Sequence, residues 1–167
     1  NPGGLLNAGI QVASQFISDG PVMIESLRDG SEQVHEARPG GLATDIPLVL
    51  LINEGSASAA EIVASAVQDY KRALLVGQTT YGKGTIQTWI DLSEGNGAVR
   101  ITYARWLSPH GRSVHGVGVT PDVEIRLSMT DDESGLDPQL AAAEALLLEG
   151  TNSETSAVHI DADLVIH

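Results

Sequence analysis

Lys71 and Lys83 are the only lysines in this chain of 167 residues, and Lys83 stands in a glycine-rich stretch. The stretch reads VGQTTYGKGTIQ over residues 76–87 and contains G-x-x-x-x-G-K, which is how a nucleotide phosphate-binding loop begins. Such a loop also needs a Ser or Thr after the lysine, for the metal ion, and a following helix, whose N-terminus binds the phosphate. Here Gly84 follows Lys83, and TIQTWI alternates as a strand does. The sequence therefore disfavours nucleotide binding at Lys83.

A lysine can instead act as a general base when apolar neighbours disfavour its charged ammonium form. Leu75, Val76 and Ile86 are apolar residues close to Lys83 in the sequence. On an extended chain Gln87 would share a face with Lys83, and its side-chain oxygen could orient a neutral amine. For Lys83 taken alone, an exposed lysine in a glycine-flanked turn stays open as the alternative.

A nucleophile for such a base is offered by NEGSASAAEI, residues 53–62, which stands between a predicted strand and a predicted helix. A side chain at such a junction lies at the edge of the sheet, near the positive end of the helix dipole. Ser56 and Ser58 are both candidates from their position. Ser58 also forms the pattern S-x-x-E with Glu61, which is typical of a helix capping box, so a structural role stays open. The stretch does not match the G-x-S-x-G pattern of esterases.

Composition excludes several other classes of function. A net charge of −13 argues against a nucleic-acid surface, because phosphate binding requires clustered basic residues. The absence of cysteine excludes disulfides and thiolate chemistry. His110 and His115 have a spacing that fits no common zinc motif, and no apolar run is long enough to span a membrane. We expect no metal and no cofactor.

The hydrophobic patterns predict a mixed α/β domain. A hairpin is expected around Asp29-Gly30, and buried strands are expected at 47–52 and 72–77. Further strands are predicted over 85–92 and within 95–108. Helices are predicted over 5–18, over 56–70 and over 137–149, the last one capped by Gly150.

Five segments, in this order, resemble the carboxyl-terminal processing peptidases, also called tail-specific proteases: NPGGLL, LLINEGSASAAEI, QDYKRALLVGQTTYGKGTIQ, GRSVHGVGVTPDVEI and DPQLAAAEALL. The resemblance implies a Ser/Lys-dyad serine protease on a crotonase-like (ClpP/crotonase) α/β core. It also implies that residues 1–148 are the C-terminal part of the catalytic domain, incomplete at its N-terminus and without the upstream PDZ module. Residues 149–167 match nothing in the family and form a tail of unknown role.

The same resemblance assigns the catalytic residues. The second serine of GSASA, Ser58, is the expected nucleophile, and the lysine of YGKG, Lys83, is the expected general base. Gln87 matches the glutamine that supports this lysine in some members of the family.

The remaining expected site residues are backbone groups and one carboxylate. The N–H groups of Ala59 and of Gly3 are the expected oxyanion-hole donors. Glu61 is expected to cap the helix, with a supporting role at the site left open.

The resemblance implies an endopeptidase that cleaves unfolded or C-terminally tagged proteins outside the cytoplasm, in the periplasm, cell envelope or thylakoid lumen. Its expected partner is a protein or peptide substrate, bound through its C-terminal region, while homo-oligomerisation is left open. One alternative is an inactive scaffold or peptide-binding relative, against which the intact Ser58, Lys83 and Gln87 count. Another is a crotonase-type acyl-CoA enzyme, which would need more basic residues for the CoA phosphates than the nine in this chain.

Overall fold

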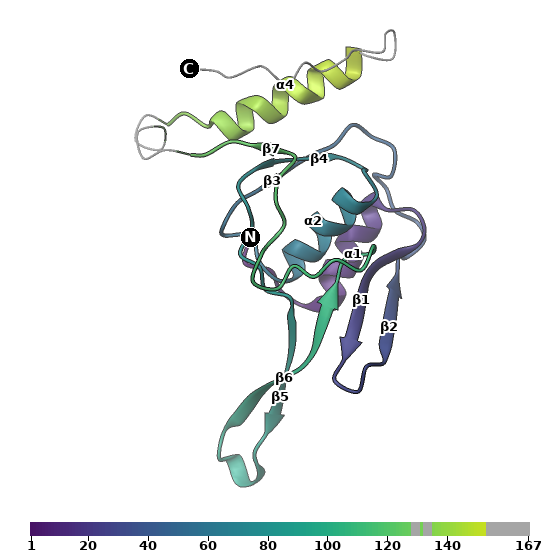
Figure 1. Cartoon of the computed structure of the whole chain (residues 1–167), viewed down its shortest axis with the longest axis vertical. Helices are drawn as coiled ribbons and strands as arrows, with labels where there is room; N and C mark the ends of the chain where they lie inside the picture. The colour runs from purple at the N-terminus through teal and green to yellow at the C-terminus, as the bar shows by residue number, and fades with distance from the viewer. Residues whose placement is uncertain (128–130, 132–134, 153–167) are drawn as a thin grey trace.

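The computed structural model describes residues 1–127, 131 and 135–152, and its architecture is mixed α/β, as predicted (Figure 1). The helices are α1 (Leu6–Phe16), α2 (Ala59–Asp69) and α4 (Pro138–Asn152), with a short 3-10 helix η1 at Ser93–Gly95. The strands are β1 (Pro21–Leu27), β2 (Glu32–Glu36), β3 (Val49–Ile52), β4 (Leu74–Gly77), β5 (Thr85–Asp91), β6 (Ala98–Leu107) and β7 (Val123–Glu124).

The strands form two sheets in the described part of the chain. One is antiparallel with four strands in the order β2-β1-β6-β5, and the other is parallel with three strands in the order β3-β4-β7. The predicted hairpin around Asp29-Gly30 is confirmed as β1 and β2. Its turn is closed by Asp29, whose Oδ1 accepts from Ser31 N at 2.9 Å and from Ser31 Oγ at 2.6 Å.

The core lies where α1 and α2 pack against each other and on β1. Its members include apolar residues of the two helices, of the residue after α1 and of the strands β1, β3, β4 and β6: Ile10, Ala13, Ile17, Val22, Met23, Ile52, Ile62, Val63, Val67, Leu75 and Trp106. Each fully buried side chain of this size contributes about 1.5–3 kcal/mol relative to an exposed one. This packing holds α2 in place, and it thereby positions Ser58, which directly precedes the first residue of the helix.

Two sequence predictions need correction. The strand predicted to be buried is β3, but only Ile52 is buried within it, and Leu51 is 41% exposed. Successive side chains of a strand point to opposite faces, so Leu50 and Ile52 face the core while Leu51 faces outward. The predicted cap at Gly150 is also wrong, because α4 continues through it to Asn152. One glycine costs a helix only about 1 kcal/mol, which an Ala/Leu-rich helix tolerates.

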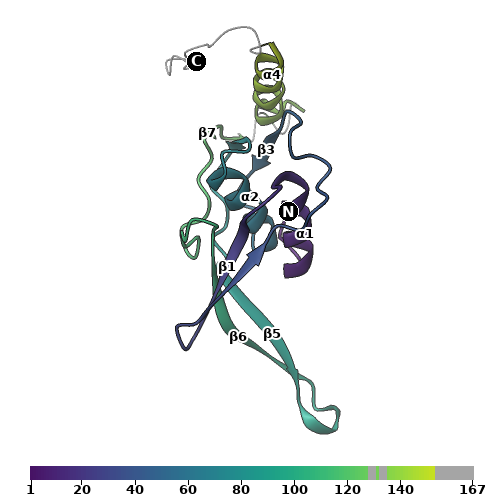
Figure 2. The same ribbon diagram turned by 90° about the vertical axis from the view of Figure 1, so that its right-hand side faces the viewer.

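The strands β5 and β6 leave the body of the molecule as a long hairpin, at the end opposite α4 (Figures 1 and 2). We call residues 88–103 the arm. At its base Ile86 pairs with Ala104 and Gln87 pairs with Thr102, so Tyr103 is an extra residue on the β6 side. Such a bulge bends and twists a ribbon, and here it lies where the hairpin leaves the body.

Candidate active site

The turn from β3 into α2 holds Ser58 in an unusual backbone conformation. Ser58 stands at the N-cap of α2 with φ 57° and ψ −119°. A non-glycine residue in this region is strained by about 1–3 kcal/mol and persists only where its surroundings impose it. A strained serine at a sharp strand-to-helix turn is also how esterases expose their nucleophile. Ser58 is half-buried, so the turn holds it near the surface.

The structure separates the two candidate serines. Ser56 is 7% exposed, and its Oγ accepts a hydrogen bond from the backbone N–H of Asn53 at 3.2 Å. Its buried hydroxyl therefore stabilises the turn between β3 and α2. Ser58 has the better exposure and the strained backbone, so it is the better nucleophile candidate of the two.

Glu61 connects the Ser58 turn to the loop of Lys83. Its side chain is fully buried at 0% exposure. Oε2 accepts from the backbone N–H of Ser58 at 2.8 Å and from that of Lys83 at 2.8 Å. Oε1 accepts from the backbone N–H of Gly82 at 2.6 Å and from the Thr80 hydroxyl at 2.5 Å. Four donors thus satisfy one buried carboxylate, which is the condition under which a charge is tolerated in the interior.

The capping role predicted for Glu61 is confirmed, since its bond to Ser58 N–H belongs to a capping box at the start of α2. The bonds to the Lys83 loop go beyond that prediction, because nothing in the local pattern S-x-x-E refers to residues 80–83. The pattern Y-G-K-G gives no hint that its main-chain donors point at a carboxylate. The network extends further, since Thr80 Oγ1 accepts from the backbone N–H of Val119 at 2.7 Å.

Lys83 lies in the loop before β5, just ahead of the strand predicted over 85–92. Its backbone is held from both sides, since its N–H donates to Glu61 and its carbonyl accepts from Trp106 Nε1 at 3.0 Å. The side chain is half-buried. Among the described residues no hydrogen bond joins Lys83 Nζ to Ser58 Oγ; what joins the two residues is Glu61, through their backbone N–H groups.

Gln87 lies near the start of β5 and has an acceptor without a partner. Its Nε2 donates to Thr102 Oγ1 at 3.2 Å, whereas its Oε1 is buried and makes no hydrogen bond. A buried carbonyl oxygen left unpaired costs about 1–3 kcal/mol, so this oxygen is available to a nearby donor.

Gly3 packs directly against the Ser58 turn. The chain is held there by a bond from Ala57 N–H to the Asn1 carbonyl at 3.0 Å. A Cβ on Gly3, whose φ is +88°, would lie 2.9 Å from Ala59 N and 2.4 Å from the Ala57 carbonyl oxygen, so only glycine fits. The two predicted oxyanion-hole residues are therefore neighbours. In this structure the N–H of Gly3 donates to Asn1 Oδ1 at 2.9 Å.

A small cavity of about 80 Å³ opens beside Ser58. Its other walls are mainly apolar, with Leu6, Ile62, Ile86 and Trp106 among the lining residues. Because a water molecule takes up about 30 Å³, the cavity has room for a small side chain.

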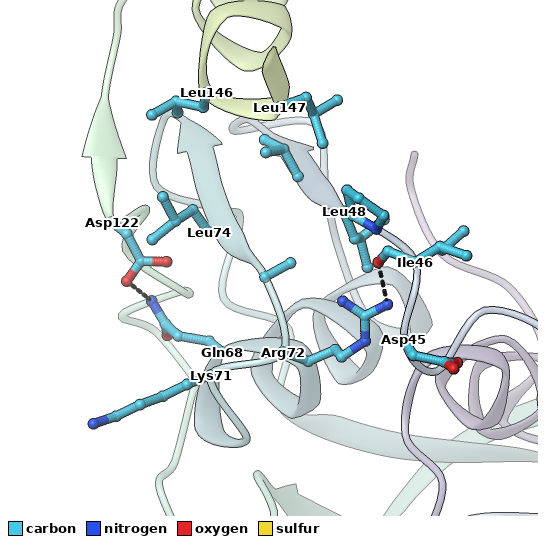
Figure 3. A pocket seen from close by; sticks show the side chains of 13 residues that line it. Asp45, Ile46, Leu48, Gln68, Lys71, Arg72, Leu74, Asp122, Leu146 and Leu147 are labelled. Atoms are coloured by element: carbon cyan, nitrogen blue, oxygen red, sulfur yellow. Dashed lines mark hydrogen bonds between the residues drawn. The ribbon is translucent and has the colours of Figure 1, made fainter. Parts of the chain in front are cut away.

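A larger cavity, of about 600 Å³, lies at the opposite end of α2 (Figure 3). Gln68, Arg72 and Leu147 are among its lining residues, and none of the predicted site residues reaches it. The Arg72 side chain is engaged there in holding the chain, since Nη2 donates to the carbonyls of Ala43 at 2.7 Å and Ile46 at 2.6 Å. We therefore place the candidate site at the Ser58 end of α2, although its cavity is the smaller one.

No group of three or more residues in the described part of the chain is arranged to bind a metal ion. His110 and His115 are both exposed. None of the helices within the described ranges has the length and apolar character needed to cross a bilayer.

Comparison with known proteins identifies the family. A family model described as peptidase family S41 matches residues 1–125. The chain belongs to peptidase family S41. It is 41% identical over 145 residues to a carboxy-terminal-processing protease of Bartonella bacilliformis, covering 86% of the chain and 33% of that protein. It is 39% identical over 170 residues to a carboxyl-terminal-processing protease of Synechocystis, covering the whole chain and 39% of that protein.

Among solved structures, the S41 chain is similar to a photosystem II D1 C-terminal processing protease. The sequence identity is 40% and the TM-score is 0.70, over 75% of this chain and 32% of that one. The chain thus covers 32–39% of the length of these three relatives.

Proposed function

We propose that this chain carries the catalytic residues of a serine endopeptidase in which Ser58 is the nucleophile and Lys83 is the general base. The observation that carries the proposal is the buried Glu61 carboxylate, which binds the backbone N–H groups of both residues at 2.8 Å. Two segments far apart in the sequence are thereby held at one point. The S41 membership of the chain supports the same assignment.

In the proposed reaction, Ser58 Oγ attacks the scissile carbonyl carbon while the neutral Lys83 amine takes the hydroxyl proton. The oxyanion that forms is stabilised by backbone N–H groups of Ala59 and Gly3, once the Gly3 N–H has left Asn1 Oδ1, to which it donates here. When the carbon–nitrogen bond breaks, the Lys83 ammonium gives its proton to the leaving amine, and the acyl group stays on Ser58. Water, deprotonated by Lys83, then attacks the ester, and the released Ser58 oxygen takes the proton back.

Two further side chains serve as positioning residues in this proposal. Glu61 holds the Ser58 turn and the Lys83 loop in register, because it accepts from the backbone of each. Gln87 has a buried and unpaired Oε1, which suits an acceptor for the Lys83 amine in the state where the amine meets the Ser58 hydroxyl. That state requires movement of the Lys83 side chain, since no hydrogen bond joins the two groups here among the described residues.

The expected substrates are unfolded or C-terminally tagged proteins, and the small apolar cavity suits a small apolar residue just before the cleaved bond. The relatives named above are processing proteases, and we infer the same class for the protein to which this chain belongs. We further infer a crotonase-like core, residues 1–148 as the C-terminal part of its catalytic domain, and a location outside the cytoplasm.

The test uses two matched pairs of variants. Cleavage of a fluorescently labelled unfolded protein should be lost in Ser58→Ala and in Lys83→Ala, by about 10³-fold or more. Ser113→Ala, at another exposed serine, and Lys71→Ala, at the second lysine, should retain it. A fluorophosphonate probe should label the parent chain, and mass spectrometry should place the label on Ser58.

Labelling at another residue, or cleavage that survives Ser58→Ala, would overturn the assignment. A chain that binds the unfolded protein but neither cleaves it nor accepts the probe would be the inactive peptide-binding relative. Tight binding of coenzyme A would indicate the acyl-CoA alternative.

A further inference from the structure

The strand β5 has an open side, and two hydrogen bonds identify the main-chain groups that face it. Trp106 N–H donates to Gly84 O at 3.1 Å, and Leu92 N–H donates to Gly97 O at 2.9 Å. The direction of main-chain groups alternates along an antiparallel pair. The bulge residue lies on β6, so the alternation along β5 is uninterrupted from Gly84 to Leu92. Both of these residues are even-numbered, and both direct their main-chain groups at β6.

The even-numbered positions of β5 therefore point their main-chain groups at β6, and the odd-numbered ones point to the open side. The odd-numbered positions are Thr85, Gln87, Trp89 and Asp91. β5 is the end strand of its sheet, so no strand of the described residues pairs with its outer side, and no turn or loop backbone bond of these residues starts from those N–H groups. Trp89 O receives only a contact of 3.5 Å from the hydroxyl of its neighbour Thr88.

The open side begins at the candidate active site. Thr85 and Ile86 line the same 80 Å³ cavity as Ser58, and Lys83 stands two positions before the first residue of β5. A chain paired with β5 would therefore reach that cavity without a turn. The seven residues of the strand extend for about 23 Å at 3.3 Å per residue.

An exposed apolar face accompanies this side along the arm. Ile90 is 48% exposed, and Val99 and Ile101 on β6 are each 42% exposed. Ile90 pairs with Val99, and Ile101 pairs with Thr88, so these side chains share the face that Ile86 begins at the cavity. Apolar residues gathered on one exposed face mark a surface that binds a partner.

The other outer strand of the same sheet is protected. β2 reads EQVHE, and both of its ends, Glu32 and Glu36, are exposed acidic residues. Charged residues on an edge strand discourage pairing with another chain. The only charged residue of β5 is Asp91, at the end of the strand far from the cavity. Of the two edge strands of this sheet, β5 is therefore the one whose side chains allow another chain to pair with it.

We propose that an extended segment of the substrate polypeptide pairs with the open side of β5, covers the apolar face of the arm and leads into the cavity beside Ser58. The proposal rests on the proposed peptidase function. An unfolded polypeptide is the partner that fits, because it offers both unpaired main-chain groups and apolar side chains. A folded protein offers both together only at an exposed edge strand.

The test is the affinity of the Ser58→Ala chain for a permanently unfolded protein, reduced and carboxymethylated α-lactalbumin with a fluorescent label. Trp89→Pro removes an outward N–H and obstructs the edge, yet leaves the ladder to β6 intact, because proline is tolerated where the N–H faces solvent. Trp89→Ala is the matched control, since it loses the same side chain and keeps the N–H. We expect Trp89→Pro to raise Kd about 10-fold or more above that of Trp89→Ala.

Amide hydrogen exchange gives a second readout that needs no substitution in the arm. Binding should slow exchange at Thr85 and Trp89, whose N–H groups face outward, and change it little at Thr88 and Ile90, which already pair with β6. This measurement decides the question if Trp89→Pro fails to fold.

Equal Kd values for folded Trp89→Pro and Trp89→Ala, or protection that appears only outside β5, would overturn the proposal. So would a concentration-dependent dimer that Trp89→Pro dissociates while polypeptide binding is unchanged, because the edge would then join two copies. Fluorophosphonate labelling of the parent chain reports the peptidase function separately, and binding to the Ser58→Ala chain does not depend on its result.

Discussion

The junction around Glu61 and the arm adjoin along the chain, yet they are built in opposite ways. In the junction a buried charge has every partner inside the protein, and four donors converge on it. In the arm several apolar side chains are exposed, among them Trp89, Ile90 and Ile101, and the outer side of β5 pairs with no other strand of the described residues. A satisfied polar cluster fixes geometry, whereas an uncovered apolar surface gains stability from what binds to it. From this difference we expect single substitutions to lower the free energy of unfolding strongly in the junction and only slightly in the arm.

The largest effect is expected at the centre of the junction. Glu61→Ala leaves three backbone N–H groups and the Thr80 hydroxyl without their acceptor, so it should lower the free energy of unfolding by about 3–5 kcal/mol. Urea denaturation measures this. Glu54→Ala, at an exposed glutamate in the turn before α2, should change it by less than about 0.5 kcal/mol. Equal costs at the two positions would mean that the carboxylate does not hold the junction.

A smaller effect is expected at the edge of the same network. Thr80→Val keeps the shape but removes the hydroxyl that donates to Glu61 and accepts from Val119 N–H, at a cost of about 1–3 kcal/mol. Thr79→Val is the matched control, because Thr79 is exposed. Thermal unfolding of both variants at one pH compares them, and a Thr80→Val chain as stable as the Thr79→Val chain contradicts the prediction.

At the base of the arm the expected effect appears only in alkali. Burial raises the pKa of Tyr103 above its ordinary value of 10.0, and the charge of Glu25 and a hydrogen bond to it act in the same direction. The folded state thus favours the neutral phenol, so this contribution to stability is present below pH 10 and is lost as the pH rises above it. Tyr103→Phe should lose less stability between pH 8 and pH 10.5 than the parent chain, by urea denaturation.

The same titration in Tyr81→Phe provides the control for that prediction, since Tyr81 is 69% exposed. If Tyr103→Phe and the parent chain lose stability in parallel, Tyr103 is not the group responsible.

The smallest effect is expected on the arm itself. Ile101→Val should change the free energy of unfolding by less than about 0.3 kcal/mol, because Ile101 is 42% exposed. Ile62→Val makes the same chemical change where the side chain is 2% exposed, and should cost about 0.5–1.5 kcal/mol. Differential scanning calorimetry of the two variants would show whether the contrast holds. A cost at Ile101 as large as that at Ile62 would mean that the arm is already packed.

Local patterns in the sequence were sufficient for most of the elements. The periodicity of residues 5–18 predicted α1, and Asp29-Gly30 predicted the first hairpin, because both signals depend on neighbours in the chain. The buried character predicted for β3 was wrong at Leu51, since exposure depends on what covers each face of a sheet. The continuation of α4 through Gly150 was missed for a related reason: capping preferences are weak compared with an Ala/Leu-rich helix that packs on β3 and β4.

The sequence by itself determined the family and named Ser58, Lys83 and Gln87, because ordered motifs at these positions carry the resemblance whatever the coordinates are. It also determined that Ser58 and Glu61 form a cap, since three residues separate them on one helix end. Only the tertiary structure decided that Glu61 also binds the Lys83 loop, that Gly3 packs on the Ser58 turn and that β5 has an open side. Those contacts join segments far apart in the chain, and such pairings follow from how the core packs rather than from any local pattern.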